Sequence, residues 1–261
     1  RKKGTTSYSS SAPTITNVGS VEIEYRVSKT NYNTKTGSYT VTVTKGTPSI
    51  TAPTAKTLTY NESNQTLINA GSVPSGCTMY YKLGNGSWST SLPQAKDAGT
   101  YTVYYKVTGN SNWNDVAQQS ISVTINKKTC AATAPTAKTL TYTGSAQALV
   151  NAGSSSEGTM YYKLGNGSWS TSVPTATNAG SYTVYWEVRP TDTNNYVKNN
   201  GSSVSVTIGK KTASYSSTTS FTYNGSARTA VTSMVGCSVK SGTNSATNVG
   251  SYSVVIKISD T

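Results

Sequence analysis

The sequence predicts an all-β fold of small sandwich modules repeated in tandem, and three observations support this. Long blocks recur: residues 78–91 are identical to residues 159–172, and residues 51–60 to residues 133–142. Apolar and polar residues alternate along many segments, as they do in a strand with one buried face. No segment has the 3.6-residue apolar period of an amphipathic helix. We therefore expect one compact β module for each period of about 80 residues.

The repeats also set the expected domain boundaries. The expected divisions are the C-terminal part of a module (1–46), a complete module (47–128), a second complete module (129–211) and the N-terminal part of a module (212–261). The closing strand of the last module is expected to be missing, and the first residue is expected to fall inside a module. The sequence thus predicts an array that is longer than this chain.

Three kinds of strand are expected in each module. One strand recurs four times, at residues 21–27, 101–107, 182–188 and 252–258. A Met-Tyr-Tyr-Lys-Leu segment precedes it in the complete modules and leads through a Gly-Asn-Gly hairpin signal to a tryptophan. A third alternating segment closes the module, at residues 39–43, 121–125 and 204–208. Short strands at this spacing favour an immunoglobulin-like sandwich over a closed barrel.

The joints between modules are expected to be stiff. Closing strands lead directly into linkers of a few residues, and Ala-Pro pairs at residues 52–53 and 134–135 restrict the backbone at the start of the next module. Short, proline-containing linkers behave as semi-rigid spacers. We therefore predict that the modules form a semi-rigid rod.

Several motifs recur at fixed places in the modules. They are Leu/Phe-Thr-Tyr-x-Gly (residues 140–144 and 221–225), Asn-Ala-Gly-Ser-Tyr-Thr-Val (178–184), a loop with Asn-Tyr or Asn-Trp, and Val-Thr-Ile-x-Lys at the module end. This pattern, over nearly the whole chain, resembles bacterial immunoglobulin-like repeats of the MBG type. The resemblance implies a spacer or adhesive module of large bacterial surface proteins or of some bacteriophage virion proteins. Residues 61–63, Asn-Glu-Ser, depart from the pattern, which leaves that turn open to a different geometry.

The chain is strongly basic, with a formal net charge of +13. Lysines recur at equivalent module ends, as Lys127, Lys128, Lys210 and Lys211. Charged strand ends keep sheet edges soluble and unpaired. They also attract anionic surfaces in a salt-dependent way, which is the second interpretation. Specific nucleic-acid binding is not expected, because no helix or recognition motif accompanies the charge.

Aromatic residues give the candidate ligand-binding sites. The candidates are the loop residues Trp113, Tyr196 and Tyr32, the hairpin residues Trp88 and Trp169, and the outward residues Tyr80, Tyr104, Tyr161 and Tyr185. A ring beside an asparagine suits a sugar, because the ring stacks on the sugar face and the amide binds hydroxyls. The alternative for the loop and hairpin rings is packing over the core. For the outward tyrosines it is cross-strand pairing on a solvated sheet.

Catalysis is not expected. The chain has no histidine, nine acidic residues and three scattered cysteines, so the usual general bases and nucleophiles are scarce. No zinc or calcium motif occurs, and we expect no metal or cofactor. No apolar run approaches the roughly 18 residues of a membrane span.

These observations favour a non-enzymatic segment of an extracellular fibre or stalk on a bacterial surface. Its expected partners are glycans or anionic polymers of the cell surface or mucus, bound weakly and at several sites. The alternative is a bacteriophage virion protein, in the head or tail fibre or as a decoration, that attaches to mucus or host and contacts other virion chains. A third possibility is that the modules are accessory repeats of a larger enzyme.

Overall fold

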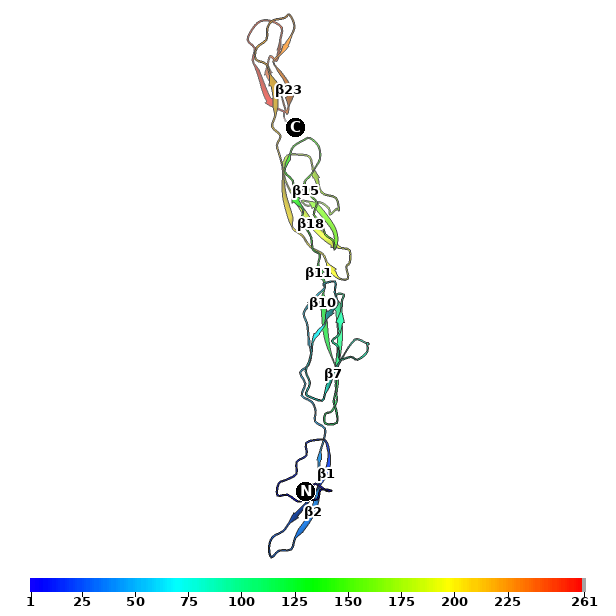
Figure 1. The fold of residues 1–261 in the computed structure, drawn as a ribbon. Coiled ribbons are helices and arrows are strands. Elements are labelled where there is room, and N and C mark those ends of the chain that lie inside the picture. Colours follow the sequence, from blue (N-terminus) through cyan, green and yellow to red (C-terminus); the bar gives the residue numbers. More distant parts are fainter. Residues whose placement is uncertain (260–261) are drawn as a thin grey trace. The chain divides into compact units, whose positions relative to one another are not determined.

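The computed structural model describes residues 1–259, and every regular element among them is a β-strand (Figure 1). The all-β prediction is therefore confirmed. Two compact units are present: Arg1–Thr129 with Asp192–Val197, and Cys130–Thr191 with Lys198–Thr261. The last two residues of the predicted segment 212–261 lie outside the described residues.

Residues 47–128, the second module, form a β-sandwich whose larger sheet has four strands. In order across the sheet they are β4 (Leu58–Thr59), β10 (Val116–Asn126), β9 (Gly99–Thr108) and β7 (Thr78–Leu83). The closing strand β10 pairs antiparallel with β9 and parallel with β4, so Ile125 lies between Gly99 and Leu58. Two short antiparallel pairs complete the sandwich: β3 (Thr54–Ala55) with β6 (Ile68–Asn69), and β5 (Gln65–Thr66) with β8 (Gln94–Ala95).

The core of this module follows the sequence alternation. On β9, Val103, Tyr105 and Val107 are at most 4% exposed, whereas the intervening side chains face outward. Val123 and Ile125 of β10 and Leu67 and Ile68 of the opposite layer are also fully buried. Each such side chain contributes about 1.5–3 kcal/mol by leaving water. The buried aromatic and branched side chains of the strands thus form the hydrophobic core of the module.

Residues 129–211, the third module, repeat this arrangement strand for strand. Its larger sheet contains β13 (Leu140–Thr141), β20 (Ser203–Gly209), β18 (Gly180–Pro190) and β16 (Gly158–Leu164), in that order. Its short pairs are β12 (Thr136–Ala137) with β15 (Val150–Asn151), and β14 (Gln147–Ala148) with β17 (Thr175–Ala176). In the closing strand β20, Ile208 lies between Gly180 and Leu140, as Ile125 does in the second module.

The two end segments have fewer strands. Residues 1–46 contain one antiparallel pair, β1 (Gly19–Val27) with β2 (Lys35–Val43). Residues 212–259 contain three such pairs: β21 (Ser214–Ser217) with β23 (Val231–Val235), β22 (Arg228–Thr229) with β25 (Ser245–Ala246), and β24 (Cys237–Gly242) with β26 (Val254–Ile258).

The turn at residues 61–63 keeps the geometry of its copies despite its different sequence. Glu62 adopts a left-handed backbone with φ +67°, and the equivalent residues Gly144 and Gly225 have φ +86° and +74°. A non-glycine residue in this region is strained. Glu62 therefore places a carboxylate side chain where the equivalent glycines of the other copies have no side chain.

Candidate ligand-binding face and module joints

The outward face of the second module carries alternating tyrosines and lysines. Tyr80 and Lys82 lie on β7, and Tyr104 and Lys106 lie on β9, while their neighbours Tyr81 and Tyr105 are buried. The strand register places Tyr80 opposite Lys106 and Lys82 opposite Tyr104. Aromatic and cationic side chains are therefore mixed on one surface.

Trp88 joins this surface through the hairpin that follows β7. Backbone hydrogen bonds between Ser89 and Tyr81 (2.7 and 2.9 Å) fold the segment after the turn back onto the sheet. The Nζ atoms of Lys82 and Lys106 then lie 5.0 and 4.7 Å from the centre of the Trp88 ring. Lys82 Nζ is also 5.0 Å from the centre of the Tyr104 ring. Such contacts are cation–π interactions, each contributing about 0.5–1 kcal/mol at exposed sites.

We call Tyr80, Lys82, Trp88, Tyr104 and Lys106 the module-2 face cluster. All five side chains are half-buried. Within residues 1–259, no carboxylate lies within 4.0 Å of Lys82 or Lys106 Nζ. The cluster thus holds two positive charges against one ring without an acidic partner, which is a suitable surface for an anionic group.

The corresponding face of the third module is built differently. Tyr161, Lys163, Trp169 and Tyr185 occupy the same places, and Lys163 Nζ lies 5.1 Å from the centres of both the Trp169 and Tyr185 rings. At the position of Lys106, however, stands Glu187. Among residues 1–259, Lys163 is therefore the one lysine that lies over the tryptophan ring of this module.

Glu187 is 3% exposed and has two basic partners. Its Oε1 accepts a hydrogen bond from Arg189 Nε at 2.7 Å, and its Oε2 accepts one from Lys198 Nζ at 2.8 Å. Burial disfavours the charged carboxylate, but these hydrogen bonds outweigh it and hold the pKa of Glu187 below its ordinary value. Arg189 also stacks over Tyr161, 4.0 Å from the ring centre, so this acid organises the outward face.

The loop after β9 binds the end of the first segment through Asn112. Asn112 Oδ1 accepts a hydrogen bond from the backbone N–H of Val18 (3.0 Å), and its Nδ2 donates to Asn17 Oδ1 (3.3 Å). The backbones also pair, because Gly46 N–H donates to Asn112 O (3.0 Å) and Asn114 N–H donates to Gly46 O (2.8 Å). This contact is the first joint.

The loop at residues 192–197 makes the same contact with the end of the second module. Asn195 Oδ1 accepts from Ala98 N–H (2.7 Å), its Nδ2 donates to Asp97 Oδ1 (3.2 Å), and its backbone O accepts from Lys128 N–H (2.9 Å). Here β11 (Lys128–Thr129) and β19 (Tyr196–Val197) pair in parallel. Nδ2 of Asn195 also donates to Asp192, which lowers the pKa of that carboxyl. This contact is the second joint.

The loop aromatics lie inside the two joints. Trp113 is half-buried, and its ring covers Gly46 so closely that a Cβ atom there would be 2.9 Å from the ring. Tyr196 is 8% exposed, packs edge-on against Tyr60 with ring centres 5.3 Å apart, and donates its hydroxyl to Glu62 at 2.6 Å. These placements favour packing over sugar binding. Tyr32 lies outside the joints and is 71% exposed, with Lys29 Nζ 5.6 Å from the centre of its ring.

The four module-end lysines form two groups, one in the second joint and one exposed to solvent. Lys127 Nζ donates to Thr193 O at 2.6 Å, and Lys128 Nζ lies 5.6 Å from the centre of the Tyr196 ring, so both belong to the second joint. Lys210 and Lys211 are exposed, and within residues 1–259 neither has an ion pair.

The sequence did not predict the residues that make the joints. It suggested that the asparagine beside each ring binds sugar hydroxyls, but the side chains of Asn112 and Asn195 bind the backbone N–H groups of Val18 and Ala98 instead. Glu62 was predicted only as an unusual turn residue. The available signal was an Asn beside the ring in each loop together with the recurring Asn/Asp-Ala/Val-Gly turn that begins the alternating strand. The ion pairs of Glu187 had no repeated signal, because this acid occurs in one copy only.

Among residues 1–259 no group of three His, Cys, Asp or Glu side chains is placed to hold a metal ion. In the same range, no helix is long and apolar enough to cross a membrane. The chain matches no known protein-family model, and no curated protein is significantly similar to it.

Proposed function

We propose that this chain is a non-enzymatic segment of an extracellular stalk, in which tandem immunoglobulin-like modules form a semi-rigid rod. The observation that carries the proposal is the repeated joint. Asn112 and Asn195 bind equivalent backbone N–H groups, of Val18 and Ala98, at two places in the chain. A stalk on a bacterial cell or on a bacteriophage virion needs such a joint at every module boundary.

The energetics of the joints suit this role. Each joint has backbone hydrogen bonds and two bonds from one asparagine side chain. Each bond contributes a net 0.5–1.5 kcal/mol or so, and packing of the half-buried Trp113 or the buried Tyr196 adds to the total. Several such contacts next to a linker of a few residues favour one inter-module arrangement over free rotation.

Small-angle X-ray scattering of the full chain tests this proposal. We expect a rod-like profile for the native chain and a smaller average dimension for the double variant Asn112→Ala/Asn195→Ala, whose joints are weakened. Asn33→Ala is the matched control, because Asn33 lies in the equivalent loop of the first segment, is exposed, and makes no such contact among residues 1–259. A compact profile for the native chain would contradict the stalk.

We also propose that the stalk adheres to anionic polymers, such as acidic glycans of a cell surface or of mucus, through the module-2 face cluster. The supporting observation is that Lys82 and Lys106 both approach Trp88 without a nearby carboxylate. An acidic sugar would bridge the two ammonium groups and contact the aromatic side chains. Binding at one such site is expected to be weak, salt-dependent and strengthened by repetition.

Titration of tryptophan fluorescence with hyaluronan, at low and physiological salt, tests the adhesive role. We expect Lys106→Glu, which introduces the acid of the third module, to weaken binding about tenfold. Lys210→Glu is the control: it makes the same charge change at an exposed module end and should weaken binding less. Dextran serves as the neutral polymer. Equal losses in the two variants would mean that net charge alone attracts the polymer, and binding to dextran would point to a neutral sugar instead.

A further inference from the structure

In each complete module a strand near the start of the module lies directly beside the closing strand. β4 pairs in parallel with the end of β10 in the second module, and β13 pairs in parallel with the end of β20 in the third. The chain enters each module ahead of the first of these strands and leaves it after the second. A pull on the two ends of a module therefore draws the two strands past each other along their length, and the bonds between them are loaded together.

Two hydrogen bonds join β4 to β10 in the second module. The backbone N–H of Tyr60 donates to Asn126 O at 2.8 Å. The side chain of Asn126 donates back across the same contact, from Nδ2 to Leu58 O at 3.1 Å. Tyr60 is 8% exposed, so the backbone bond lies at the edge of the core. Strand sliding in this module thus requires both bonds to break.

The third module has the same contact without the side-chain bond. Tyr142 N–H donates to Gly209 O at 2.8 Å, as Tyr60 does in the second module. Gly209 takes the place of Asn126, so no side chain there can donate to Leu140 O. A Cβ atom added at Gly209 would lie 3.5 Å from Leu140 O, which is an ordinary van der Waals contact. The site therefore has room for the asparagine of the second module.

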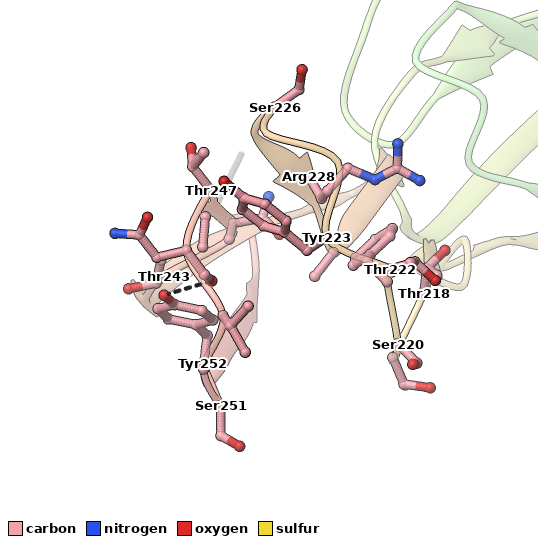
Figure 2. A pocket seen from close by; sticks show the side chains of 18 residues that line it. Thr218, Ser220, Thr222, Tyr223, Ser226, Arg228, Thr243, Thr247, Ser251 and Tyr252 are labelled. Carbon is pink, nitrogen blue, oxygen red and sulfur yellow. Dashed lines mark hydrogen bonds between the residues drawn. The ribbon is translucent and has the colours of Figure 1, made fainter.

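The end segment, residues 212–259, shows the same part of a module with no closing strand among the described residues. The stretch that corresponds to β4, residues 218–224, forms no strand. Most of it lines a hollow of about 430 Å³, with Thr222 and Tyr223 in the wall (Figure 2). Tyr223 is 63% exposed, whereas its equivalent Tyr60 is 8% exposed. Pairing with the closing strand is thus what holds this stretch in the complete modules.

We propose that the β4–β10 and β13–β20 contacts are mechanical clamps, which keep the modules folded when the stalk is pulled, and that the clamp of the second module is the stronger one. The inference rests on the proposed stalk, because a stalk that is anchored at one end and attached at the other carries tension. Bonds that are loaded together break in one step, which makes unfolding under force slow. The third module then unfolds first and relieves the tension. The second module, with its face cluster, stays folded and able to bind.

Constant-force magnetic tweezers on the full chain, held by its two ends, test the proposal. We expect Asn126→Ala to unfold the second module about three- to tenfold faster at the same force, because one hydrogen bond of the clamp is lost. Gly209→Asn should slow unfolding of the third module by a similar factor. Gly209→Ala is its matched control, which adds the Cβ atom without the amide and should not slow unfolding. Glycines inserted after Asn166, in an exposed hairpin turn, lengthen the extension step of the third module and so identify it.

A variant in the core separates the clamp from general stability. Met79 is 8% exposed and lies on β7, at the opposite edge of the sheet from β4. Met79→Ala should weaken the second module against urea more than Asn126→Ala does, because it leaves a cavity. Under force it should speed unfolding less, because β7 is still packed when the clamp breaks.

Two results would overturn the clamps. One is a set of unfolding rates under force that follows the ranking in urea, with Met79→Ala the fastest. The other is equal unfolding rates for Gly209→Asn and Gly209→Ala, since the amide then adds nothing to the contact. A compact scattering profile would contradict the stalk but would leave these rates unchanged, so failure of the clamps and failure of the stalk are distinguishable.

Discussion

The second and third modules have the same frame but different surfaces. Both place an isoleucine of the closing strand between a leucine strand and a glycine strand, with the same register. They differ on the outward face, where Lys106 corresponds to Glu187, and in the joint, where Trp113 corresponds to Tyr196. The two modules therefore have the same core, whereas the outward face and the joint differ from one module to the other. Changes in the core should therefore act equally in both modules, and changes at the surface should not.

The largest effect is expected for the shared core. Ile125→Ala and Ile208→Ala each remove a side chain that is 1% exposed, so each should lower the free energy of unfolding of its module by about 2–5 kcal/mol. Hydrogen exchange by mass spectrometry, which resolves the two modules within one chain, measures both effects. Val43→Ala, at the half-buried equivalent in β2, should cost much less. Clearly unequal losses of stability at Ile125 and Ile208 would show that the cores of the two modules are not equivalent.

The sequence predicted this core well, because its signal is local. Alternation with period two placed Val103 and Val107 on the buried face of their strand, and both are at most 1% exposed. The joints were not predicted, because Asn112 and its partner Val18 are 94 residues apart and nothing local connects them. The ion pair of Glu187 was not predicted either. Its partner Lys198 lies in the loop that follows the alternating strand, and this loop is longer in the third module than in the second.

A smaller effect, limited to the third module, is expected for Glu187→Gln. Loss of the carboxylate weakens the bonds to Arg189 and Lys198, and hydrogen bonds to charged groups contribute about 1.5–3 kcal/mol. Urea unfolding followed by tryptophan fluorescence measures the loss. Lys106→Gln, at the same position of the second module, should cost less, about 0.5–1 kcal/mol, because Lys106 has no ion pair among residues 1–259 and loses only its cation–π contact with Trp88.

The same acid should make the third module sensitive to low pH. The folded pKa of Glu187 lies below its ordinary value of 4.5, so the carboxylate stabilises the fold above that pH. This stability is lost as the pH falls through the folded pKa, when the group must take up a proton. Unfolding at neutral and acidic pH should therefore differ more for the native chain than for Glu187→Gln. An identical pH dependence in both proteins would show that the ion pairs contribute no stability.

The two joints should respond unequally to loss of their asparagines. Asn112→Ala and Asn195→Ala each leave a backbone N–H without its acceptor, which costs about 1 kcal/mol and speeds exchange of the Val18 or Ala98 amide several-fold. Asn195→Ala should cost more, because it also removes the bond to Asp192 and lets the pKa of that carboxyl rise. Amide exchange and a carboxyl titration by NMR follow the two effects. Equal changes at both joints would contradict the extra role of Asn195.

The smallest effect is expected for Tyr196→Phe. This change removes only the tyrosine hydroxyl of the second joint, which has no counterpart on Trp113 of the first joint. The hydroxyl of Tyr196 donates to Glu62 at 2.6 Å, while the edge-on contact with Tyr60 stays in place when only the hydroxyl is removed. We expect a loss of about 0.5–1.5 kcal/mol in the stability of the joint, measured by amide exchange at Lys128. A double-mutant cycle with Glu62→Gln separates the bond from its surroundings. If the two losses simply add, the hydroxyl and the carboxylate act independently, and the left-handed turn at Glu62 needs another explanation; if they couple, the strained glutamate is retained for this joint.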